Sequence, residues 1–230
     1  MTAQVLPRPV RAAVISAGAW SQSSHLPTLK AHPGVDLVAL SSPNEATARK
    51  LAAAFDVPLA LTDWREILAQ KPDIVVVSSP PVAHEEQVVA ALESGAHVLV
   101  EKPFALEAGA ANRMRDRAAR VGRTLLVGFG WPAAPGFSLA KALIDKGEVG
   151  QIEHLTMHLA VNTRALLLGG ADGGWAEAPD AMPNERMRPL VLRQQLAGVA
   201  AMTRGEAHSL ATLREALEMQ EIVEAILASG

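Results

Sequence analysis

The sequence predicts an α/β protein built on a doubly wound parallel sheet. Runs of three or four apolar residues occur within 74–77, 97–100 and 124–127, and similar runs occur within 11–15 and 35–40. Helical patterns and turn residues separate these runs. Continuous apolar strands that alternate with helices are typical of a parallel sheet covered by helices on both faces. This is the architecture of a Rossmann-type nucleotide-binding domain.

The first elements follow one another in the order that this architecture requires. The strand at 11–15 enters a turn at residues 16–18, and a second strand occupies 35–40. Asn44 is expected to cap a helix that extends to Phe55, because apolar side chains recur along this segment at helical spacing. The remaining apolar runs supply the other strands of the sheet.

The sequence divides into a Rossmann-type domain at 1–130 and a reduced C-terminal region at 131–230. The elements expected in the second region are a helix at 135–146, a strand at 151–161, a loop at 163–187, and helices at about 188–202 and 211–228. The loop is rich in glycine, proline and alanine, which favours irregular structure. The second domain is therefore expected to be vestigial, with one or few strands.

The expected strand at 151–161 has a period of two. Such alternation is typical of a half-buried strand, and an unpaired strand with an apolar face invites pairing with its own copy. We therefore expect a homodimer through this strand. His154 and His158 lie on its polar face, but four residues separate them by ~13 Å, which one metal ion cannot bridge. No metal site is expected.

Composition excludes several classes of protein. The chain has 230 residues, a net charge of −3, no cysteine and no tyrosine. Without a basic run, nothing indicates a nucleic-acid partner. Without an apolar segment of membrane-spanning length or a signal sequence, we expect a cytoplasmic protein with no membrane association. The absence of cysteine excludes disulfides and thiolate metal ligands.

The most informative segment is Gly95–Leu106, in which an apolar strand runs into Glu101, Lys102 and Pro103. A second motif, Ser79-Pro80-Pro81-Val82-Ala83-His84, lies just upstream. Together these motifs resemble the Gfo/Idh/MocA family of NAD(P)-dependent oxidoreductases. The resemblance covers about residues 10–162 and again about 188–230.

The resemblance implies a catalytic role for Lys102. In that family the Glu-Lys-Pro motif helps to place the nicotinamide and the substrate, so Glu101 and Pro103 belong to the expected site. A lysine tuned by desolvation can transfer protons near neutral pH. The alternative is a solvated lysine that merely follows a strand. His84 is included in the expected site, although we expect it to brace the loop rather than to perform chemistry.

The expected cofactor turn departs from the dinucleotide fingerprint. The three glycine positions of G-x-G-x-x-G are Ser16, Gly18 and Ser21 here. A serine at the first position adds a side chain where the backbone should be bare. The alternative is that Ser16 keeps an acceptable backbone and nothing is lost. Ala19 and Trp20 complete this part of the expected cofactor site.

The turn after the second strand bears on cofactor choice. It contains Ser41 and Ser42 and lacks the carboxylate that would bond the ribose 2′-hydroxyl of NAD. If a cofactor binds, NADP is therefore favoured over NAD, and the change at Ser16 predicts weak or absent binding. By resemblance, the segment Ser79-Pro80-Pro81 also contributes to the cofactor site.

Two parts of the family pattern have no counterpart. An aspartate and a histidine four residues later usually follow the first strand of the second domain, and most strands of that domain are also missing here. Three functions remain open for a small-molecule substrate. These are a repurposed enzyme that uses Lys102 for cyclisation, elimination or isomerisation, an NADP-dependent oxidoreductase of sugar-like substrates or polyols with a dimer-completed site, and a non-catalytic dinucleotide-binding protein. The sequence favours the first.

Overall fold

The computed structural model describes residues 8–130, 135–152 and 212–228, together with part of 191–206. Its body is a six-stranded parallel sheet with the strand order β3-β2-β1-β4-β5-β6. The strands are β1 (Val10–Ile15), β2 (Val35–Ser41), β3 (Leu59–Leu61), β4 (Ile74–Val77), β5 (His97–Val100) and β6 (Leu125–Val127). This order is that of the doubly wound dinucleotide-binding fold, so the predicted fold class is confirmed.

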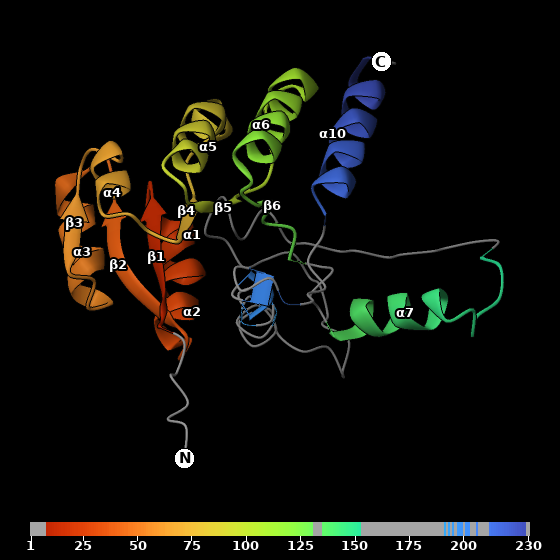
Figure 1. Cartoon of the computed structure of the whole chain (residues 1–230), viewed down its shortest axis with the longest axis horizontal. Helices are drawn as coiled ribbons and strands as arrows, with labels where there is room; N and C mark the ends of the chain where they lie inside the picture. The colour runs from red at the N-terminus through yellow and green to blue at the C-terminus, as the bar shows by residue number, and fades with distance from the viewer. Residues whose placement is uncertain are drawn as a thin grey trace, which may run out of the picture.

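Helices cover both faces of the sheet (Figure 1). They are α1 (Ala19–Ser23), α2 (His25–Ala31), α3 (Glu45–Ala54), α4 (Arg65–Ala69), α5 (His84–Glu93), α6 (Ala108–Val121), α7 (Pro135–Asp145) and α10 (Leu213–Ala228), with a 3₁₀ turn η1 at Pro81–Ala83. One apolar core joins the sheet to α5, α6 and α10, and the other joins it to α2 and α3. No helix in the described ranges combines the length and apolar character needed to cross a bilayer.

The strands are buried on both faces, as the apolar runs predict. All four residues of β4 are buried, and β4 and β5 occupy the predicted ranges 74–77 and 97–100. At ~25 cal/mol per Å² of apolar surface, this two-sided burial is the main source of stability for the sheet. The short strand β3 is the exception, because two of its three apolar residues are exposed.

Local signals set the helix ends. The side chain of Asn44 accepts a hydrogen bond from the Thr47 amide at 2.9 Å, so the predicted cap of α3 is confirmed. Helix α6 ends at Gly122, which has φ +62. That left-handed conformation is cheap only for glycine, and the chain turns there into β6.

Both terminal helical segments pack on the sheet. Ala216 and Leu217 of α10 join the core beneath α6, whereas Val199 and Met202 join the core on the opposite face. The helical residues described within 191–202 agree with the prediction for that segment. Almost all of the expected strand at 151–161, and the loop at 163–187, lie outside the described residues.

Candidate functional site

The turns that carry the predicted site residues lie at one edge of the sheet. Because all six strands are parallel, the turns that follow β1, β2, β4 and β5 meet at their carboxyl ends. Strands β1 and β4 are adjacent, and the chain winds in opposite directions from them. Ligands of doubly wound sheets bind at this switch point. The fold therefore brings the three predicted motifs to one place.

The first turn keeps its shape although a serine replaces the first glycine. Ser16 has φ +58, a left-handed conformation that costs an ordinary residue about 1–2 kcal/mol. Two hydrogen bonds to β2 hold the turn, from the Ser16 amide to Ser41 Oγ at 3.3 Å and from the Ala17 amide to the Ser41 carbonyl at 2.6 Å. The serine is tolerated here through strain that glycine would avoid.

Gly18 leaves the approach to this turn open. It precedes α1, and a Cβ built on it would meet no heavy atom within 4 Å. A pyrophosphate needs such bare backbone for close approach. Among the described residues, the turn thus fits a dinucleotide at the middle fingerprint position. Ala19 is exposed beside it.

Glu101 is the anchor of the site. Its Oε1 accepts a hydrogen bond from Trp20 Nε1 at 2.7 Å and lies 2.8 Å from His25 Nε2, while its Oε2 accepts from the Lys102 amide at 3.1 Å. Burial raises the pKa of this carboxyl, but the hydrogen bonds and the charge of His25 outweigh burial, so the pKa lies below its usual value. A buried carboxylate with these contacts is a positioning group and not a free base.

Lys102 is held next to the first turn. Its backbone is fixed by Glu101, and its Nζ lies 5.9 Å from the centre of the Trp20 ring, within the range of a cation–π contact. The Lys102 side chain is exposed among the described residues. The ammonium is available to a ligand at the switch point. Pro103 follows, also exposed, through a cis peptide bond.

His84 braces the two loops of the motif region. It is fully buried at the start of α5, and its ring nitrogens lie 2.9 Å from the Ser79 carbonyl and 3.1 Å from the Phe104 carbonyl. It therefore ties the loop after β4 to the loop after Lys102. The structural role expected of His84 agrees with this geometry. No chemical role follows, because the ring is 0% exposed.

The other residues predicted to bind the cofactor differ in their exposure to solvent. Ser41, Ser42 and Ser79 are buried, and Ser79 Oγ has no hydrogen-bond partner among the described residues. Pro80 is exposed and Pro81 half-buried. The buried serines shape the turns, and the side chains accessible to a ligand are the exposed ones of the same loops. His154 and His158 lie outside the described residues.

Sequence reasoning missed the link between Trp20, His25 and Glu101. The motifs place Trp20 in the expected cofactor site and Glu101 in the expected catalytic site, and the family resemblance implies a mainly structural role for His25. The pairing joins residues 76 to 81 positions apart, for which a single sequence carries no signal. The only available hint was that a buried glutamate requires donors.

Comparison with known proteins agrees with the geometry. The Gfo/Idh/MocA profile, described as "Oxidoreductase family, NAD-binding Rossmann fold", matches residues 10–129. The D-glucoside 3-dehydrogenase of Escherichia coli is 32% identical over 150 residues, which cover 63% of this chain and 41% of that protein. The chain thus spans less than half the length of this relative.

Solved structures give the same picture. A 3-ketoreductase from Actinomadura kijaniata in complex with NADP superposes with a TM-score of 0.57 at 28% identity, covering 63% of this chain and 46% of that one. The scyllo-inositol dehydrogenase of Lactobacillus casei has a TM-score of 0.59 at 23% identity, covering 63% and 43%. The second likeness concerns the fold alone.

Proposed function

Because this chain belongs to the Gfo/Idh/MocA oxidoreductases, we propose that it binds NADP(H) at the carboxyl edge of the sheet and uses Lys102 to move a proton to or from a sugar-like or polyol substrate. The observation that carries the proposal is the pairing of an open turn at Gly18 with an exposed ammonium at Lys102, which the buried Glu101 connects. The open turn is the reason to prefer redox chemistry over the rearrangement chemistry that the sequence favours.

The residues present fit the cofactor in two respects. Bare backbone at Gly18 admits a pyrophosphate, and the turn at Ser41 and Ser42 carries no carboxylate to repel a 2′-phosphate. When bound, the nicotinamide would supply the hydride that a carbonyl substrate accepts. The side chain of Ser16, at a position where the fingerprint has bare backbone, makes this affinity weak.

The role of Lys102 follows from its surroundings. An exposed ammonium at the carboxyl edge of the sheet could donate a proton to a developing alkoxide, and the neutral amine could take one from a hydroxyl in the reverse direction. Glu101 does not compete for this role, because its carboxylate already accepts hydrogen bonds. Trp20 limits the space available to Lys102 on one side.

A second function stays open because of Ser16. If the strained turn prevents cofactor binding, the same lysine serves a cyclisation, elimination or isomerisation that needs proton transfer alone. The substrates of the relatives described above do not decide between the two functions, because the chain spans less than half of the length of those proteins.

The test is a titration of the purified protein with NADPH, followed by turnover assays on a panel of sugars and polyols. The proposal expects saturable NADPH binding weaker than micromolar, and its loss in Gly18→Val, which closes the open turn. Ala119→Val, on the exposed face of α6, is the control. Absence of NADPH binding, together with activity that needs no nicotinamide, would favour the rearrangement chemistry.

A further inference from the structure

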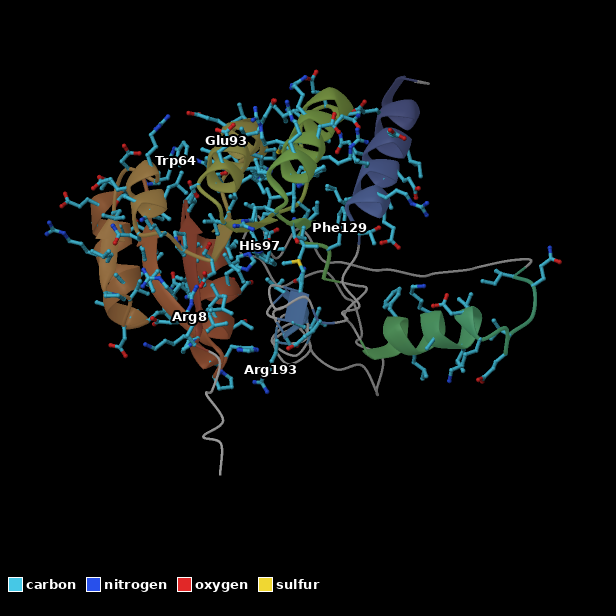
Figure 2. The ribbon with its side chains drawn as sticks, in the orientation of Figure 1. Arg8, Trp64, Glu93, His97, Phe129 and Arg193 are labelled. Carbon is cyan, nitrogen blue, oxygen red and sulfur yellow. The ribbon has the colours of Figure 1, made fainter. Side chains whose placement is uncertain are left out.

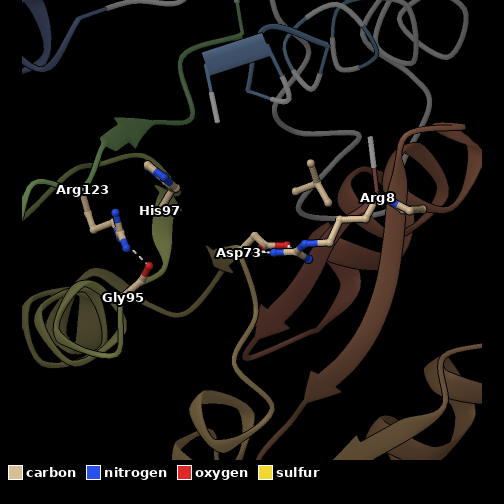
Figure 3. A pocket seen from close by; sticks show the side chains of 7 residues that line it. Arg8, Asp73, Gly95, His97 and Arg123 are labelled. Carbon is tan, nitrogen blue, oxygen red and sulfur yellow. Dashed lines mark hydrogen bonds and ion pairs between the residues drawn. The ribbon is translucent and has the colours of Figure 1, made fainter. Parts of the chain in front are cut away.

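A polar cavity lies at the opposite edge of the sheet, where the strands begin. It has a volume of about 280 Å³ and is lined by Arg8, Pro9, Val10, Asp73, Gly95, His97 and Arg123 (Figure 3). Figure 2 shows Arg8 at the lower end of the sheet and Trp64 at the upper end. The cavity is therefore distinct from the carboxyl edge that carries Lys102.

The only carboxylate among the lining residues is already neutralised. Asp73 accepts hydrogen bonds from Arg8 Nη1 at 2.9 Å and Nη2 at 2.7 Å, and from the Arg11 amide at 2.9 Å. Burial raises the pKa of Asp73, but the contacts with Arg8 and Arg11 outweigh it and hold the pKa below its usual value. Asp73 thus stays ionised, and Arg8 offsets its charge.

Arg123 leaves the cavity with excess positive charge. Its Nε donates to the Gly95 carbonyl at 2.5 Å, which fixes the guanidinium plane at the cavity wall. Among the described residues no carboxylate pairs with Arg123, so its terminal nitrogens keep their donors. A fixed guanidinium fork matches two oxygens of one oxyanion.

His97 adds a donor to the same cavity. Its Nδ1 accepts a hydrogen bond from the Thr124 amide at 3.1 Å, so the neutral ring carries its proton on Nε2. Burial lowers the pKa of His97, the charge of Arg123 lowers it further, and Asp73 partly opposes both. The imidazole therefore lies near the guanidinium of Arg123, which pairs with no carboxylate among the described residues.

We propose that this cavity binds a small oxyanion, the phosphate or carboxylate group of a metabolite, between the Arg123 guanidinium and the Nε2–H donor of His97. The Arg8–Asp73 pair forms the opposite wall and contributes no net charge. The site is independent of the cofactor edge, because β5 separates His97 from Glu101 by four residues, or ~13 Å.

Calorimetry in low-salt buffer tests this site with two probes, inorganic phosphate and acetate. Saturable binding of either probe is expected, and the stronger one identifies the chemical class. Arg123→Gln should weaken binding by about tenfold or more, the order for a lost hydrogen bond to a charged group. Arg49→Gln, which removes the same charge from an exposed i,i+4 pair on α3, should leave binding unchanged.

A second measurement places the anion and does not depend on a variant. The ¹⁵N resonances of the His97 ring in the unmodified protein should shift in proportion to saturation by the stronger probe. The proposal is overturned if neither probe saturates, if Arg123→Gln binds as tightly as the unmodified protein, or if binding leaves the His97 resonances in place. The last result would put the anion elsewhere, such as the turn at Gly18.

Discussion

Trp20 and Glu101 share a hydrogen bond of 2.7 Å that ties the turn after β1 to the turn after β5. The first turn is the expected cofactor cradle and the second presents Lys102. One buried carboxylate thus sets the position of Lys102, the proposed proton-transfer group, relative to the turn at Gly18. His25, on the next helix, contacts the same Oε1 atom of Glu101 through its Nε2 atom at 2.8 Å.

Loss of this hydrogen bond should cost stability. Trp20→Phe removes the N–H donor and keeps most of the ring, so the free energy of unfolding should fall by about 1.5–3 kcal/mol, the range for hydrogen bonds to charged groups. Urea unfolding measures the change. Trp64→Phe is the matched control, because Trp64 contacts Arg65 through its ring face. Equal effects of the two substitutions would argue against the anchoring role.

Acid should weaken the same anchor. The pKa of Glu101 in the folded protein lies below its usual value of 4.5, since the hydrogen bonds and the charge of His25 outweigh burial. Its contribution to stability is therefore fully present above about pH 4.5. As the pH falls below that value, the unfolded chain takes up the proton first, and the contribution is lost on the way down to the folded pKa.

Comparison with Glu101→Gln isolates this effect from other carboxylates. The unfolding free energy of the unmodified protein minus that of the variant should be constant above about pH 4.5. Below that pH the difference should decrease, because the unmodified protein loses the contribution of Glu101. Glu66→Gln on α4 is the control. A difference that stays constant as the pH falls would contradict the anchor assigned to Glu101.

The side chain of Ser16 should limit cofactor affinity. Ser16→Gly removes the Cβ and hydroxyl from the turn that the pyrophosphate would approach, and NADPH binding should tighten by about tenfold. Lys71→Gly removes the side chain of another left-handed residue, φ +51, on an exposed turn and should leave NADPH binding unchanged. Micromolar NADPH affinity in the unmodified protein would show that Ser16 is no obstacle.

The strand expected at 151–161 should mediate dimer formation. Met157→Lys places a charge on the expected apolar face and should dissociate the dimer, whereas Thr156→Lys on the polar face should not. Light scattering at working concentrations reports the mass. A monodisperse monomer of the unmodified protein would contradict this prediction.

The fold could be predicted because its signal is local. The apolar runs predicted the first and last residues of β4 and β5, and Asn44 predicted the start of α3. Strand β3 was missed, because a three-residue edge strand with exposed side chains has no periodicity. The sequence also placed the terminal helices in a separate region, although α10 packs on α6 and β6; that contact depends on Ala216 and Leu217 meeting a distant surface.

The site was predictable only as a set of motifs. Lys102, Gly18 and His84 were identified from their motifs, but their geometry depends on contacts between residues far apart in the sequence. The exposure of Lys102 and the burial of Ser42 could not be predicted, because both depend on which loops pack over them. The contacts of Glu101 with Trp20 and His25 could not be predicted either, because they also depend on how distant segments pack.

The most direct test of the central claim is turnover by Lys102→Ala of the substrate that the panel identifies. Removal of a positioned proton-transfer group typically costs about 10²- to 10⁴-fold in rate, so kcat should fall by that order while the circular dichroism spectrum is kept. Lys50→Ala, on the exposed surface of α3, should keep full activity. An undiminished rate in Lys102→Ala would contradict the assignment and place the chemistry elsewhere.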